Sequence, residues 1–164
     1  MPSIYFAGPD VFSPDYDRHT ALIRDLCAKA GITPLLPGDE EHDDSLGIYN
    51  CNLDLIRKAD GVIANLNPFR GVVEPDSGTV FECGFALALG KVVIGIVSDQ
   101  RDLVSKLKDR GATFDEKMNV HIYDGTMVED FGLPLNLMLS HSLAATVATV
   151  HQAVAEVHKR LPKK

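Results

Sequence analysis

Two near-continuous apolar runs constrain the fold of this chain more than any other feature of its sequence. Residues 61–66 read Gly-Val-Ile-Ala-Asn-Leu, and residues 91–97 read Lys-Val-Val-Ile-Gly-Ile-Val. A strand with one solvated face alternates apolar and polar residues, whereas a strand covered by helices on both faces does not. The two runs therefore predict the third and fourth strands of a parallel sheet.

The rest of the chain alternates strand-like and helix-like segments around these runs. Three further strands are predicted at residues 3–7, 33–36 and 120–123. Helices are predicted at residues 14–30, 45–58, 75–91 and 102–109. A last helix is predicted from Asn136 or Ser140 to Lys159, with an apolar stripe formed by Leu143, Val147, Val150, Val154 and Val157. We expect an α/β fold, a doubly wound sandwich of roughly five parallel strands, as a single domain over residues 1–164.

Composition and charge exclude several classes of protein. The net charge of −7 argues against a nucleic acid polymer as partner, because sequence-independent binding of nucleic acid needs a basic face. No apolar stretch reaches the roughly 18 residues of a membrane span, and no export signal is evident, so we expect neither membrane association nor export. Three cysteines without metal or redox spacing indicate reduced thiols in a cytoplasmic protein. The six histidines show no paired metal spacing, so no metal or cofactor is predicted.

One carboxylate is out of place in the predicted helix at residues 75–91. Between Val80 and Leu89, every residue except Glu82 is apolar, small or glycine, so the helix is expected to be buried nearly all round. A buried carboxylate must be paired, protonated or functional, because an unpaired buried charge costs several kcal/mol. The nearby helix N-terminus favours its ionised form. Glu82 is therefore a candidate nucleophile or general base, with a structural ion pair as the alternative.

The ligand site is expected beyond the carboxyl ends of the strands, where doubly wound sheets bind their ligands. The segments there are residues 7–14, 65–76, 98–101 and the chain after residue 123. Most of them carry clustered acids or amides, which disfavours an anionic ligand. Familiar nucleotide motifs fail: residues 84–91 approach a phosphate-binding loop, but with five intervening residues instead of four and Val92 in place of Ser or Thr.

Several stretches taken together resemble the nucleoside 2-deoxyribosyltransferases. They are Ile4-Tyr-Phe-Ala-Gly-Pro9, Ile56 followed by Asp60-Gly-Val-Ile-Ala, the block from Asp76-Ser-Gly-Thr through Glu82 to Gly90-Lys91, and Asn136-Leu-Met138. The six-residue spacing from Asp76 to Glu82 with its trailing glycines is the specific part. The resemblance covers most of residues 3–97 and the segment near Asn136. It implies a flavodoxin-like fold, in agreement with the pattern of elements.

The resemblance also implies roles for individual residues. Glu82 corresponds to the nucleophile that attacks C1′ of a 2′-deoxynucleoside, Tyr5 to the tyrosine that positions it, and Asp76 to the aspartate that contacts the sugar hydroxyls. Asn136, with Met138 near it, corresponds to an asparagine that reaches a neighbouring subunit's site, so a homo-oligomer is expected. The partners implied are a 2′-deoxynucleoside and a free nucleobase.

The sequence departs from the family pattern where the nucleobase is handled. Asn52 stands where some members have an aspartate, so neither the group that donates a proton to the base nor the preference for purine or pyrimidine follows from the resemblance. Asn65, Asn67 and Phe69, after the third strand, are alternatives for that role. Gly8, Asp10 and Phe12, in the turn after the first strand, are expected to line the substrate site.

Two other functions fit parts of the pattern. The nearer one is an N-glycosidase that hydrolyses a deoxynucleoside or its 5′-monophosphate, for which Ser13, Arg18 and Arg70 could bind the phosphate. The chemistry is shared: a carboxylate below C1′ stabilises an oxocarbenium-like state, and the second step uses either a base or water. The more distant one is a non-catalytic nucleotide-sensing module.

Overall fold

A five-stranded parallel sheet forms the centre of the computed structural model, which describes residues 1–39, 44–71 and 73–161. Its strand order is β2-β1-β3-β4-β8, and every neighbouring pair is parallel. The strands are β1 (Ser3–Ala7), β2 (Thr33–Leu35), β3 (Gly61–Asn65), β4 (Val92–Ile96) and β8 (Ala145–Val147). This arrangement confirms the predicted fold class, including the two central strands.

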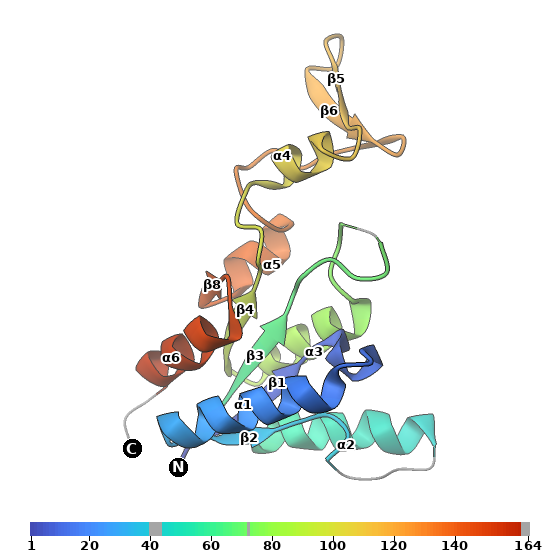
Figure 1. Cartoon of the computed structure of the whole chain (residues 1–164). Helices are drawn as coiled ribbons and strands as arrows, with labels where there is room; N and C mark the ends of the chain where they lie inside the picture. The colour runs from blue at the N-terminus through green and yellow to red at the C-terminus, as the bar shows by residue number, and fades with distance from the viewer. Residues whose placement is uncertain (40–43, 72, 162–164) are drawn as a thin grey trace.

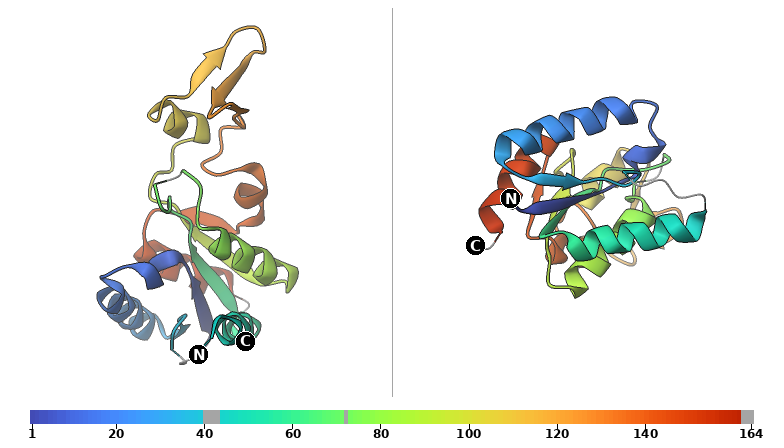
Figure 2. Two further views of the ribbon diagram at one scale, coloured as in Figure 1. Left: turned by 90° about the vertical axis from the view of Figure 1, so that its right-hand side faces the viewer. Right: turned by 90° about the horizontal axis from the view of Figure 1, so that it is seen from below.

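Helices cover both faces of this sheet, as the right-hand view of Figure 2 shows for α1 on one side and α2 and α3 on the other. One face packs against α1 (Tyr16–Ala30) and α6 (Val150–Arg160). The other packs against α2 (Ser45–Lys58), α3 (Ser77–Ala88) and the short α5 (Leu137–Ser142). A single 3-10 turn, η1 (Pro9–Phe12), joins β1 to α1.

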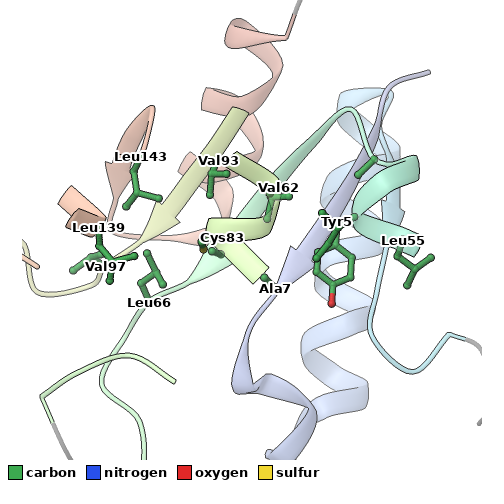
Figure 3. Close-up of a cluster of buried hydrophobic side chains, with 14 of the residues drawn as sticks. Tyr5, Ala7, Leu55, Val62, Leu66, Cys83, Val93, Val97, Leu139 and Leu143 are labelled. Atoms are coloured by element: carbon green, nitrogen blue, oxygen red, sulfur yellow. The ribbon is translucent and has the colours of Figure 1, made fainter. Parts of the chain in front are cut away.

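Side-chain alternation along β1 divides the core into these two layers. Ile4 and Phe6 pack on the α1–α6 face, whereas Tyr5 and Ala7 pack on the α2–α3 face. Tyr5 is fully buried. In Figure 3 its ring lies beside the other core side chains, with the hydroxyl turned away from the cluster.

Residues 120–123 form a strand, as predicted, but the prediction that this strand belongs to the parallel sheet is wrong. β6 (Val120–Tyr123) pairs antiparallel with β5 (Thr113–Asp115) and β7 (Thr126–Met127) in a separate three-stranded sheet. With α4 (Leu103–Lys108), this sheet projects away from the rest of the molecule (Figure 1). All four residues of β6 are only partly buried, which a strand covered on both faces would not be.

The predicted continuous helix after Asn136 is also wrong, because the chain forms three elements there. α5 ends at Ser142, the backbone of Leu143 after it is extended, and β8 then takes the fifth position in the parallel sheet. A new helix begins after Thr149, whose side chain accepts a hydrogen bond from the backbone N–H of Gln152. The apolar spacing of three and four therefore came from separate elements that happen to share one period.

The termini of α3 follow its sequence. Asp76 is the N-cap, and Gly90 adopts a left-handed conformation (φ 71°) just beyond the last turn. Lys91 Nζ reaches the end of α2 and donates to the carbonyl oxygens of Arg57 and Ala59, at 2.9 and 2.6 Å. The C-terminal ends of α2 and α3 are thus joined.

The expectation that α3 is buried all round is wrong. Thr79, Cys83 and Ala86 are its buried residues, while Phe81 and Leu89 are 50% and 44% exposed. As an outer-layer helix, α3 buries one stripe only. Within the described ranges, no helix is long and apolar enough to cross a membrane.

Candidate active site

A pocket of about 580 Å³ opens beyond the carboxyl end of β1. It lies between the loop after β1, the N-terminal half of α2 and the first turns of α3. Its lining residues are Gly8, Val11, Phe12, Pro37, Gly38, Ile48, Tyr49, Cys51, Asn52, Leu53, Asp76, Gly78, Thr79, Phe81 and Glu82. Among these described residues are two carboxylates, and none of them is Lys, Arg or His. The pocket therefore suits a neutral ligand with a large apolar surface.

Glu82 lines this pocket and is hydrogen-bonded to Tyr5, although the two residues are 77 positions apart in the chain. The hydroxyl of Tyr5 donates a hydrogen bond of 2.7 Å to Glu82 Oε1. Tyr5 reaches this point because its ring stands on the α2–α3 face of the sheet, and Glu82 lies in the second turn of α3 above that face. The pair places a carboxylate of fixed orientation at the pocket wall.

The surroundings of Glu82 work against its ionised form. Burial raises the pKa of this carboxyl to about 7, the negative charge of Asp76 adds to the increase, and the Tyr5 hydrogen bond opposes it. Burial and the neighbouring carboxylate also raise the pKa of Tyr5, so its hydroxyl stays protonated as a donor. The position near the helix N-terminus predicts an ionised Glu82. Because burial raises its pKa to about 7, the protonated and ionised forms of Glu82 are instead similarly populated at neutral pH.

Asp76 combines a structural bond with a place in the pocket. Its Oδ2 atom accepts from the backbone N–H of Thr79 at 2.9 Å and from the Thr79 hydroxyl at 3.0 Å. These bonds fix the carboxylate at the start of α3, six residues before Glu82. Both acids predicted from the sequence thus line one cavity.

The α2 wall of the pocket was predicted only at Asn52. Ile48 and Tyr49 also line the pocket, one turn before Asn52 on the same side of the helix. The Tyr49 ring lies 6.2 Å from that of Phe81 on α3. The signal in the sequence was the pair itself, two adjacent large apolar residues in a helix whose buried residues are Leu53, Leu55 and Ile56.

The loop after β1 contributes Gly8, Val11 and Phe12 to the pocket, as predicted for two of them. Phe12 is stacked on Phe69 from the loop after β3, with ring centroids 6.0 Å apart. The Arg70 guanidinium lies over both rings, 5.5 Å from Phe12 and 4.7 Å from Phe69. Neither Ser13 nor Arg18 lines the pocket.

Asp10, Asn65 and Asn67 lie behind this loop instead of in the pocket. They line a second, smaller cavity of about 190 Å³ on the α1–α6 side of the sheet. The Asn65 amide donates to both carboxylate oxygens of Asp10, at 3.0 and 3.1 Å.

Asn136 and Met138 lie outside the pocket of their own chain. Asn136 is the N-cap of α5, where its side chain accepts from the backbone N–H of Leu139 at 3.0 Å. Met138 is 74% exposed. Within one chain the structure therefore does not bring these two residues to Glu82.

Several known proteins are similar to this chain in sequence and fold. The family model described as nucleoside 2-deoxyribosyltransferase matches residues 4–138. A solved 2-desoxiribosyltransferase from Leishmania mexicana shares 38% identity with a TM-score of 0.84, covering 98% of this chain and 99% of that one. A 2-deoxyribosyltransferase from Bacillus psychrosaccharolyticus has the same fold, with 19% identity, a TM-score of 0.58 and coverage of 94% and 95%.

A curated relative from Schizosaccharomyces pombe, described as uncharacterized protein C191.05c, is 30% identical over 117 residues. That alignment covers 66% of this chain and 56% of the relative, so the chain spans little more than half of that protein's length.

Proposed function

The chain belongs to the nucleoside 2-deoxyribosyltransferase family, and from this premise we propose that it transfers 2-deoxyribose from a 2′-deoxynucleoside to a free nucleobase, with retention at C1′, in nucleoside salvage. The observation that carries the proposal is the Tyr5–Glu82 hydrogen bond at the wall of a 580 Å³ pocket. A carboxylate held in that way is suited to attack an anomeric carbon.

In the first step, ionised Glu82 attacks C1′ from the face opposite the base. The C1′–N bond breaks through an oxocarbenium-like state, its electron pair leaves with the base, and the base takes up a proton from solvent, to which the incoming base returns one in the second step. The product is a deoxyribosyl ester on Glu82. Tyr5 orients the attacking oxygen, and Asp76 accepts hydrogen bonds from the sugar hydroxyls.

In the second step, a free base attacks C1′ of the ester. The ester C–O bond breaks, Glu82 leaves as a carboxylate, and the incoming base loses a proton. Each step inverts C1′, so the product has the configuration of the substrate. If water attacks instead, the same ester is hydrolysed to free deoxyribose.

The charge of the pocket favours a nucleoside over its 5′-monophosphate. The pocket volume lies in the range of small-molecule sites and would admit either. Among the described lining residues, the charged ones are Asp76 and Glu82, and a carboxylate repels a phosphate. The Arg70 guanidinium lies over the ring of the lining residue Phe12, so an Arg70 variant is the best test of whether a 5′-monophosphate binds.

The exposed residues around the pocket support a homo-oligomer. Ile48, Tyr49 and Phe81 form a half-exposed apolar rim, and Met138 is largely exposed on α5. We propose that Asn136 and Met138 of a neighbouring subunit complete the site. Dilution to monomers should then abolish activity, and full activity of a monomer would contradict this proposal.

The reaction is tested by incubating deoxyinosine or thymidine with excess adenine or cytosine and separating the products. We expect the wild type to form the exchanged deoxynucleoside and Glu82→Ala to form none. Glu116→Ala, an exposed glutamate on the projecting sheet, is the matched control and should retain activity. Free deoxyribose without exchange would indicate the hydrolase instead, and no reaction with any pair would overturn the proposal.

The ester itself is tested without an acceptor base. Acid-quenched wild-type protein should gain the mass of one deoxyribosyl group, on the peptide that contains Glu82. Exchange activity without this adduct would argue for direct displacement.

A further inference from the structure

We propose that Asp10, Asn65 and Asn67 are positioning residues for the substrate loop, residues 8–12, which they hold from the side opposite the pocket. This inference rests on the proposed function, because it assigns the role to substrate binding. The three residues are called the positioning network below.

The positioning network joins the carboxyl ends of three neighbouring strands. Asn65, at the end of β3, donates its amide hydrogens to the Asp10 carboxylate after β1. Its Oδ1 atom accepts from the backbone N–H and the side-chain amide of Asn67, at 3.2 and 2.7 Å. Asn67 Oδ1 in turn accepts from the backbone N–H of Ser98 after β4, at 2.8 Å. The substrate loop is thereby tied to the centre of the sheet.

Gly8 is the point where this network meets the pocket. A Cβ atom on Gly8 would lie 2.5 Å from Asp10 Oδ2 and 3.0 Å from the Cβ of Asn65. The carboxylate therefore packs directly against the backbone of a pocket-lining residue. A shift of Asp10 moves that stretch of backbone, and with it the wall of the pocket.

Hydrogen bonds hold the substrate loop, and little of its own side-chain surface is buried. η1 contains no buried residue, and Phe12 is 65% exposed. The 190 Å³ cavity lies behind Asp10, where His19 Nε2 is 3.6 Å from Asp10 Oδ1. Because this space leaves room for displacement, loss of the network should free the loop.

The reacting pair is held separately from this network. Tyr5 is fully buried on β1, and Glu82 follows a capped helix start on α3. Freeing the substrate loop should therefore weaken the binding of the nucleoside while leaving the chemical step nearly intact. This separation predicts an effect on KM and not on kcat.

The test exchanges the two partners of the central bond. Asn65→Asp places two carboxylates about 3 Å apart, a repulsion that breaks the bond. In the double variant D10N/N65D, the amide at position 10 donates to the carboxylate at position 65, which also accepts from Asn67. The control is Asp102→Ala, which removes the N-cap of α4 far from the substrate loop.

We expect N65D to raise KM for the deoxynucleoside about tenfold, the value of one charge-assisted hydrogen bond, with kcat nearly unchanged. The double variant should recover the wild-type KM, and D102A should lower Tm without changing KM. An unchanged KM in N65D would overturn the proposal, and so would a fall in kcat with no recovery in the double variant.

Hydrogen–deuterium exchange provides a readout that does not depend on activity. The amides of Gly8 and of residues 10–13 should exchange faster in N65D, return to the wild-type rate in D10N/N65D, and stay unchanged in D102A. This pattern in a protein that transfers no sugar would contradict the proposed function while supporting the positioning network. Unchanged exchange in N65D would overturn the network itself.

Discussion

The pocket has two walls of opposite character. One carries Glu82 on α3, whose carboxyl is largely removed from water and is held from behind by the completely buried Tyr5 on β1. The other carries Phe12, Ile48 and Tyr49, each at least 48% exposed. The groups assigned to chemistry therefore stand on core elements, whereas those that would meet the base stand on a loop and a helix rim. Bond cleavage requires fixed geometry, but a site that takes different bases benefits from an adaptable surface.

The largest effect is expected on the buried wall, at the carboxylate itself. Glu82→Ala should reduce kcat/KM for transfer by at least about a thousandfold, because among the described lining residues Glu82 is the one carboxylate hydrogen-bonded to Tyr5. Product analysis at a high enzyme concentration measures the residual rate. Activity within tenfold of the wild type would assign the chemistry to another group.

The buried wall should also govern how stability depends on pH. The folded-state pKa of Glu82, about 7, is above its ordinary value near 4.5. Its stabilising contribution is therefore complete below pH 4.5 and is lost as pH rises through about 7, a change of up to about 3 kcal/mol. Denaturant unfolding from pH 5 to 8 measures this loss. Glu82→Gln should remove that part of the pH dependence, and parallel curves for the two proteins would contradict the assignment.

Removal of the tyrosine hydroxyl should have a smaller effect. Tyr5→Phe deletes the bond that favours the ionised carboxylate, so the pKa of Glu82 should rise further. We expect kcat/KM at pH 7 to fall about 10- to 100-fold, the range for one bond to a charged group. The acidic limb of the pH–rate profile should move to higher pH. An equal fall at every pH would mean that Tyr5 acts without changing the ionisation of Glu82.

The smallest effect is expected on the exposed wall. Phe12→Ala removes a ring that lines the pocket but packs little against the core. KM should rise about tenfold for the loss of one aromatic contact, with kcat and Tm nearly unchanged. A large fall in Tm would show that the Phe12–Phe69 stack supports the fold, and the contrast between the walls would then fail.

The sequence predicted best where one physical requirement dominates. The runs that became β3 and β4 are apolar because both sheet faces are covered. Glu82 was identified because burying an unpaired carboxylate in an apolar helix costs free energy. Residues 143–157 were misread because a helical period does not reveal that the chain leaves the helix at Leu143 and joins the sheet.

Parts of the site were out of reach of sequence patterns. The Tyr5–Glu82 contact followed from the family resemblance alone, because no local pattern links residues 77 positions apart. Ile48 and Tyr49 were missed because their place in the pocket depends on how α2 packs beside α3. Asp10 and Asn65 were expected near a ligand as polar residues at strand ends, but only the backbone geometry at Gly8 shows that they face away from the pocket.

The bonds from Lys91 to the end of α2 bear on how this pocket could be re-engineered. They join α2 and α3 at the ends farthest from the pocket, so these ends are held together independently of the pocket residues. The pocket mouth can then be widened or narrowed at positions 48, 49 and 52 without breaking the bonds between the C-terminal ends of the two helices. A library for new nucleobases should vary those three positions and leave Lys91 untouched, because its side chain makes both bonds to backbone carbonyls.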